Sequence, residues 1–288
     1  MDTATAARID RAEARLSIAV AEAAAPPCFN LVTPLAGGAA VLVRIGSPIN
    51  KIIGAGFDGP LDMAALADIE AAWHARGEPV RIELSSLAST TAAEQLGARG
   101  YRLVGFEHVM VRPITPADAA REPAFAVTEG DAAWLDTLVD GFATADGSGE
   151  PVDTHDRAAL HSVMQDFAAA QGFRRYGARY SDAPADAPAD APVGAATLRI
   201  DDGLALLCGT TTLPAARRRG VQAALLIARL RDASRSGCTL AVVTTAPGSM
   251  SQRNVERQGF TLAYVRAILL LPLPDSSGRS ADPSVTTV

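Results

Sequence analysis

Hydrophobic and polar positions along this chain repeat with two different periods, and the changes between them predict its helices and strands. Val221, Ala224, Leu225 and Ala228 recur at helical spacing and predict a helix over 221–236. Short apolar runs bounded by turn residues predict strands instead. Helices are expected over 1–24, 61–76, 90–99, 131–142, 154–171, 221–236 and 251–258. Strands are expected over 29–33, 39–45, 49–57, 80–84, 101–112, 173–180, 193–200, 204–213, 239–245 and 260–271.

The order of these elements predicts a mixed α/β fold built from two similar units. An offset of 159 residues superimposes the later parts of the two halves, placing Gly100 on Gly259 and Tyr101 on Phe260. The expected division is an N-terminal domain over 1–118, with a leading helix at 1–24, and a C-terminal domain over 119–274. A Ser- and Pro-rich tail at 275–288 is expected to be disordered, and the Asp/Ala/Pro run at 181–192 to be an extended insertion.

Composition narrows the class of protein. The chain has 288 residues, of which 48% are hydrophobic, and a net charge of −6. This balance is typical of a globular protein and argues against nucleic acid as a partner. No apolar run approaches the roughly 20 residues that span a bilayer, and the N-terminus does not resemble a signal peptide, so a cytoplasmic protein without a membrane segment is expected. Neither the cysteines nor the histidines show metal-ligand spacing; they are Cys28, Cys208, Cys238, His74, His108, His155 and His161.

The candidate chemistry lies just before the helix at 221–236. Arg217, Arg218, Arg219 and Gly220 connect a strand to the first turn of that helix. The unpaired N–H groups of a helix N-terminus attract anions, and a glycine allows a phosphate to approach the backbone. The segment therefore predicts a pyrophosphate site, although a solvated basic turn is the competing interpretation.

The same helix carries three more arginines. Arg229, Arg231 and Arg235 are expected to lie on its water-facing side. In the first half, the 159-residue offset places Asp58, Gly59, Pro60 and Leu61 where the second half has its arginines and glycine. An aspartate would then lie near the phosphate position, so only the C-terminal half is expected to retain the anion site.

These residues resemble the GNAT family of acyl-CoA-dependent N-acyltransferases. The family's cofactor motif, Gln/Arg-x-x-Gly-x-Gly/Ala, matches Arg217-Arg218-Arg219-Gly220-Val221-Gln222. Thr211, Thr212 and Leu213 resemble the splayed strand that pairs with the pantetheine arm, and Asn254 resembles an asparagine near that arm. The resemblance implies a tandem protein whose first GNAT-like domain is degenerate.

Two positions depart from the family pattern. Gln222 replaces the usual Gly or Ala, which narrows the space near the phosphates but leaves the backbone N–H available. Val255 replaces a tyrosine that serves many members as the acid toward the leaving thiolate. Tyr264 is the candidate to replace it, although a packing role is the alternative for a tyrosine on an alternating strand.

By resemblance, the function is transfer of an acetyl group from acetyl-CoA to the amine of a small molecule or peptide. The sequence does not identify the general base. Glu150, Asp153 and His155 lie where the family places substrate-binding groups, and the competing interpretation is a solvated polar loop. The alternative is a non-catalytic acyl-CoA-binding or regulatory protein, which Val255 favours. A third hypothesis makes the first half chiefly a packing or dimerisation module, and a homodimer stays open.

Overall fold

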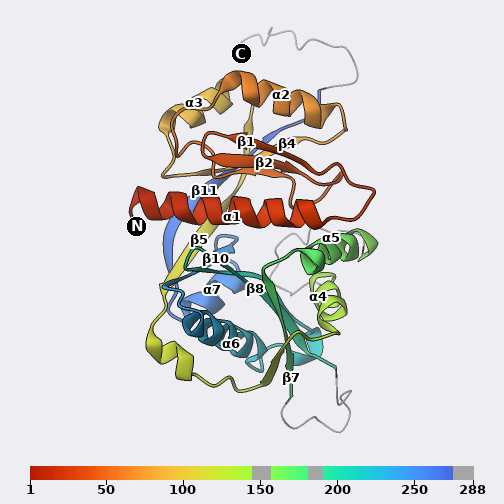
Figure 1. Cartoon of the computed structure of the whole chain (residues 1–288), viewed down its shortest axis with the longest axis vertical. Coiled ribbons are helices and arrows are strands. Elements are labelled where there is room, and N and C mark those ends of the chain that lie inside the picture. The colour runs from red at the N-terminus through yellow and green to blue at the C-terminus, as the bar shows by residue number, and fades with distance from the viewer. Residues whose placement is uncertain (145–156, 181–190, 275–288) are drawn as a thin grey trace, which may run out of the picture.

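The computed structural model describes residues 1–144, 157–180 and 191–274, in which helices flank one mixed β-sheet (Figure 1). The α-helices are α1 (Thr3–Ala23), α2 (Met63–His74), α3 (Thr90–Ala98), α4 (Trp134–Phe142), α5 (Arg157–Ala169), α6 (Val221–Arg235) and α7 (Met250–Glu256). The strands are β1 (Leu31–Leu35), β2 (Gly38–Leu42), β3 (Lys51–Ile53), β4 (Val80–Ser85), β5 (Arg102–Pro113), β6 (Ala126–Glu129), β7 (Phe173–Arg179), β8 (Gly194–Asp201), β9 (Leu204–Thr212), β10 (Leu240–Thr245) and β11 (Thr261–Leu271). Two short 3₁₀ segments are η1 (Pro116–Ala120) and η2 (Pro214–Ala216).

The two halves of the chain exchange their last strands. The sheet order is β1-β2-β3-β4-β11-β5-β10-β9-β8-β7-β6. Strand β11, from the end of the chain, therefore pairs with β4 of the first half, whereas β5 of the first half pairs with β10 of the second. The exchanged strands also pair with each other, antiparallel, at the centre of the sheet. The two halves consequently share one continuous sheet.

Helices cover the sheet on both faces. On one face α1 packs over both halves, in a cluster that includes Ile9 of α1, Val41 of β2 and Leu206 of β9. On the other face α6 and α7 pack on the second half, and α2 and α3 on the first. The alternation along β2 explains this division, because Val41 lies in the α1 cluster and Leu42 in the cluster under α2.

The prediction of a mixed α/β fold is confirmed, and nearly all the expected elements occur within a few residues of their predicted bounds. The 159-residue offset aligns α2 with α6, β4 with β10, α3 with α7 and β5 with β11. Strand β6 and the short η1 were not predicted. The proposed boundary at 118/119 falls within η1 and stays a prediction.

Several expected features fall on residues outside the described ranges. They are residues 181–190 of the expected insertion at 181–192, the tail from 275, and Glu150, Asp153 and His155. Within the described part of the chain, no helix is both long enough and apolar enough to cross a membrane.

Candidate active site

A gap opens between β9 and β10. The two strands run parallel and pair at only three positions, the last being Leu206 with Val242. Beyond it, β9 continues to Thr212 alongside β8, and β10 continues to Thr245 alongside β5. No strand in the described residues pairs with the edges that face each other, so the backbone N–H and C=O groups on these edges have no strand partner and can bond to a ligand.

The predicted strand residues lie on this open edge of β9. Thr211 pairs with Ala195 of β8, and the N–H of Leu213 donates to Val193 O at 2.9 Å. These contacts hold the segment Thr211–Leu213 from one side only. The register of β8 and β9 also shifts in this region, where Gly209 has a φ of +51°. The shifted register marks a β-bulge, which bends β9 next to the gap.

The N-terminus of α6 lies at the end of this segment and has no side-chain cap. Gly220 occupies the N-cap position with a φ of +92°, and a Cβ built there would meet no atom within 4 Å. The first helical bond runs from Ala224 N to Gly220 O at 3.0 Å. The N–H groups of the first turn, which precede Ala224, have no partner within the helix and can receive an anion.

The three predicted arginines surround that turn but differ in their contacts. Arg217 donates to Thr144 O at 2.9 Å and to Thr212 O at 3.3 Å, which ties the turn to the end of β9. Arg218 is exposed and has a φ of +65°. Arg219 is exposed as well, with its guanidinium carbon 5.7 Å from the centre of the Tyr180 ring. Arg218 and Arg219 therefore add positive charge on the solvent side of the turn.

The structure also brings together the other predicted cofactor residues. Val221 is buried at the start of α6, and Gln222 follows it. The Asn254 side-chain amide of α7 donates to the Gln222 side-chain oxygen. Val255, at the position of the family's acid, lies in the apolar cluster between α6, α7 and the sheet. It supplies no proton donor.

The equivalent position in the first half is closed. There the Asp62 side chain caps α2, accepting from the backbone N–H groups of Ala64 at 2.9 Å and Ala65 at 3.1 Å. Asp58, which the sequence placed near the phosphate position, instead forms an ion pair with Arg11 at 2.5 Å. A carboxylate already occupies the helix N-terminus, so an anion would meet repulsion rather than free donors. Asp62 directly precedes the helix and is an N-cap signal that is recognisable from the sequence.

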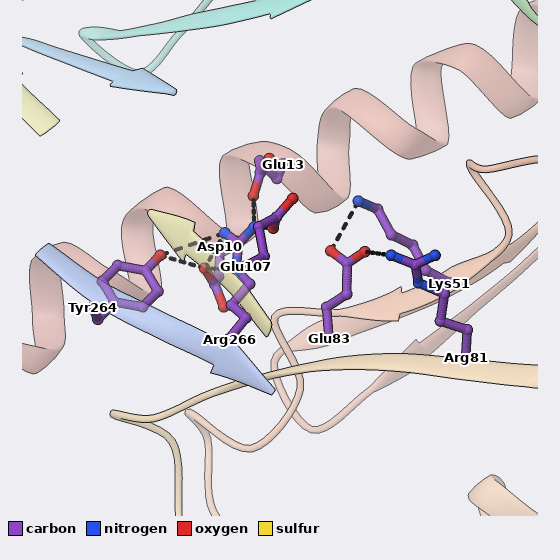
Figure 2. A network of polar contacts seen from close by, with 8 residues as sticks. All are labelled: Asp10, Glu13, Lys51, Arg81, Glu83, Glu107, Tyr264 and Arg266. Carbon is purple, nitrogen blue, oxygen red and sulfur yellow. Dashed lines mark hydrogen bonds and ion pairs between the residues drawn. The ribbon is translucent and has the colours of Figure 1, made fainter. Parts of the chain in front are cut away.

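Tyr264 lies in a buried polar network on the α1 face of the sheet (Figure 2). Its hydroxyl donates to Asp10 Oδ1 at 2.5 Å, and burial, together with Asp10, raises its pKa well above the ordinary range. Arg266, which is completely buried, bonds to the same Asp10 oxygen and forms ion pairs with Glu13 and Glu107. The hydroxyl therefore has a structural partner, and the catalytic role of Tyr264 stays a prediction.

The expectation for Arg229 was wrong. It is 2% exposed and donates to Leu225 O and Thr197 O, both at 3.1 Å, so it joins α6 to β8 beneath the helix. The helical spacing did not identify this position as buried, because arginine is ordinarily assigned to the solvent face.

No protein-family model and no curated protein matches the chain. Solved structures do match. A GCN5-related N-acetyltransferase from Kribbella flavida is 18% identical, with a TM-score of 0.60 over 93% of this chain and 98% of its own.

Two further structures are similar over most of their length. A tandem GNAT protein from the clavulanic acid biosynthesis pathway is 13% identical, with a TM-score of 0.55 over 93% of this chain and 97% of its own. A conserved protein of unknown function from Staphylococcus epidermidis ATCC 12228 is 10% identical, with a TM-score of 0.56 over 82% and 91% of the two chains. The chain therefore has a tandem GNAT fold, as its resemblance to the family implied.

Proposed function

We propose, from the premise of a tandem GNAT fold, that this protein transfers an acetyl group from acetyl-CoA to the amine of a small molecule or peptide. The observation that carries the proposal is the combination of an uncapped helix N-terminus with an open strand edge. The first turn of α6 offers N–H groups beside Arg218 and Arg219, and the gap between β9 and β10 begins at the same end of β9. The N–H groups and arginines at the helix N-terminus suit a pyrophosphate, and the unpaired strand edge suits an arm that contains amides.

In this proposal the residues act mainly by binding and orientation. The first turn of α6 with Arg218 and Arg219 binds the pyrophosphate, and Arg217 fixes the turn through Thr212 O. The open edge of β9 at Thr211–Leu213 pairs with the pantetheine amides. Asn254 bonds to Gln222 in the first turn of α6, beside the proposed phosphate site. Holding the thioester in the gap lets an incoming amine attack its carbonyl carbon directly.

Calorimetric titration of acetyl-CoA tests the binding step. The wild type is expected to bind one molecule per chain, because Asp62 occupies the corresponding helix N-terminus of the first half. A Gly220→Asp/Arg218→Ala double variant is expected to lose binding by at least 100-fold. It places a carboxylate beside the helix N-terminus and removes one exposed guanidinium.

The matched control makes the same two kinds of change in the first half: Gly59→Asp in the turn before α2, and Arg11→Ala in α1, where Arg11 pairs with Asp58 of that turn. It should bind acetyl-CoA as the wild type does, since it lies outside the proposed site. Absence of binding by the wild type would remove the basis of the proposal. Binding by the wild type followed by turnover on any amine of a panel would support the enzyme.

A non-catalytic acyl-CoA-binding protein is the second candidate. The buried Val255, in place of the family's tyrosine, is the observation that favours it. The two candidates share the binding result and differ in turnover. Binding without acetyl transfer to any amine of the panel would favour this second candidate. In either case we propose a cytoplasmic protein without a nucleic-acid partner, and a homodimer stays a prediction.

A further inference from the structure

We propose that His108, on β5 of the first half, donates the proton that the departing thiolate of CoA requires. This inference rests on the acetyltransferase proposal above. Strand β10 ends at Thr245, and the residue paired with Thr245 on the neighbouring strand β5 is His108. The exchange of strands therefore places a first-half histidine at the end of the strand that borders the gap.

His108 lies on the same face of the sheet as α6 and α7. Met110, two residues further along β5, packs with Val255 of α7 in the cluster under these helices. Residues two apart on a strand share a face, so His108 also faces α7, as its contact with Gln252 confirms. Tyr264 faces α1 on the opposite side. His108 is thus on the side where Val255 replaces the family's acid.

The contacts of Gln252 determine which ring nitrogen of His108 is available. Gln252 Oε1 accepts from Gly248 N at 2.8 Å, and its Nε2 donates to Glu256 Oε1 at 2.7 Å. The oxygen therefore points to His108 Nδ1, which lies 3.2 Å away and must be the donor. Nε2 is left as the nitrogen that can gain or release a proton.

A second observation points to a ligand at this place. Thr245 is 5% exposed, and its Oγ1 atom is buried with no hydrogen-bond partner. A buried hydroxyl without a partner is costly, and such groups often mark a site that a ligand completes. Because Thr245 and His108 are paired across the two strands on one face, both polar groups lie at the end of β10, which borders the gap, with His108 on the side of β10 away from β9.

The amine nitrogen attacks the thioester carbonyl carbon, the C–N bond forms, the C–S bond breaks, and its electron pair stays on sulfur. Protonated His108 transfers its Nε2 proton to that sulfur and becomes neutral, keeping the Nδ1 proton that Gln252 accepts. The proton lost by the amine passes to water, and His108 is protonated again from water. No oxidant or reductant is involved.

The test compares CoA with desulfo-CoA, which lacks only the sulfur. The full chain is labelled with ¹³C in its histidine rings, and a His108→Gln variant identifies the His108 resonance. Gln at this position retains a donor toward Gln252. With both ligands shown by calorimetry to bind, CoA is expected to shift the His108 signal at least twice as far as desulfo-CoA. The His74 signal on α2 should not move with either.

Equal shifts from both bound ligands, or no shift from either, would overturn the role of His108 and leave the cofactor site intact. Failure of both ligands to bind would overturn the proposed function and this inference together. On any amine that the wild type acetylates, His108→Gln should lower kcat by about 10²- to 10⁴-fold with little change in the KM for acetyl-CoA. His74→Gln, the matched control, should retain kcat, and the His108 variant should bind CoA with wild-type affinity.

Discussion

Arg229 and Arg266 both lie buried, and the protein satisfies the two guanidinium groups in different ways. Within the described residues, Arg229 donates only to carbonyl oxygens, and burial lowers its pKa to about 10. Burial alone would also lower the pKa of Arg266, but Asp10 and Glu13 outweigh it and raise that pKa instead. Removing one member of such a buried pair typically costs about 3–5 kcal/mol, because its partner is left charged and unpaired. The network around Arg266 therefore constrains where α1 lies on the sheet.

Asp118 gives a residue-scale prediction for the pH dependence of stability. Burial raises its pKa, but the Arg112 guanidinium, 2.8 Å away, and the Thr115 N–H outweigh burial and hold the pKa below its ordinary value of 3.8. A lowered carboxyl pKa contributes stability that is present above about pH 4 and is lost as the pH falls through the folded-state value. The free energy of unfolding can be measured with urea between pH 2.5 and 7. Below pH 4 it should fall less steeply with pH for Asp118→Asn than for the wild type. Parallel curves for the two proteins would contradict this account.

At the scale of elements, the contact of α4 with β9 determines the shape of the candidate site. Gly141 of α4 lies against Thr211, and a Cβ built on Gly141 would be 2.0 Å from Thr211 Oγ1. Gly141→Ala should therefore destabilise the protein by about 1–3 kcal/mol through overpacking. It should also weaken acetyl-CoA binding, since Thr211 lies on the open edge of β9. Urea unfolding and calorimetry measure the two effects.

Gly97 of α3 provides the matched control, because it is also a helical glycine but has no atom within 4 Å of a built Cβ. Gly97→Ala should stabilise the protein by about 0.5–1 kcal/mol, as expected for alanine in an exposed helix, and leave acetyl-CoA binding unchanged. A loss of binding in both variants would show that the effect of Gly141→Ala does not arise at Thr211.

Most elements could be predicted from the sequence because they depend on local patterns. The spacing of Val221, Ala224 and Leu225 predicted α6, and apolar runs between turn residues predicted the strands. The exchange of β5 and β11 could not be predicted, because nothing in the composition of a strand specifies its neighbours in the sheet. For the same reason, the pairing of His108 with Thr245 is visible only in three dimensions. The arginine turn was recognisable because its residues are consecutive.

At the scale of the whole molecule, the exchanged strands make the two halves depend on each other. The segment 119–274 expressed alone would lack β4 and β5, so β10 would lose one of its two neighbours and β11 would lose both of its own. It would also lack α1, leaving Arg266 without Asp10 and Glu13. We expect this fragment to be insoluble or aggregated. Coexpression with the segment 1–118 should recover a soluble complex, measured by gel filtration; a soluble 119–274 fragment that binds acetyl-CoA would contradict the expectation.

The central strand pair has a consequence for how copies of this protein can associate. Arg266 pairs with Glu107 across β5 and β11, and the 159-residue offset makes these two residues equivalent positions in the two halves. In a two-fold contact between identical copies, a residue on the axis faces itself. First halves meeting in this way would oppose glutamate to glutamate, and second halves would oppose arginine to arginine. The opposite charges of Glu107 and Arg266 therefore favour contact between a first half and a second half over contact between two like halves. A single chain that carries both halves makes this favourable contact internally.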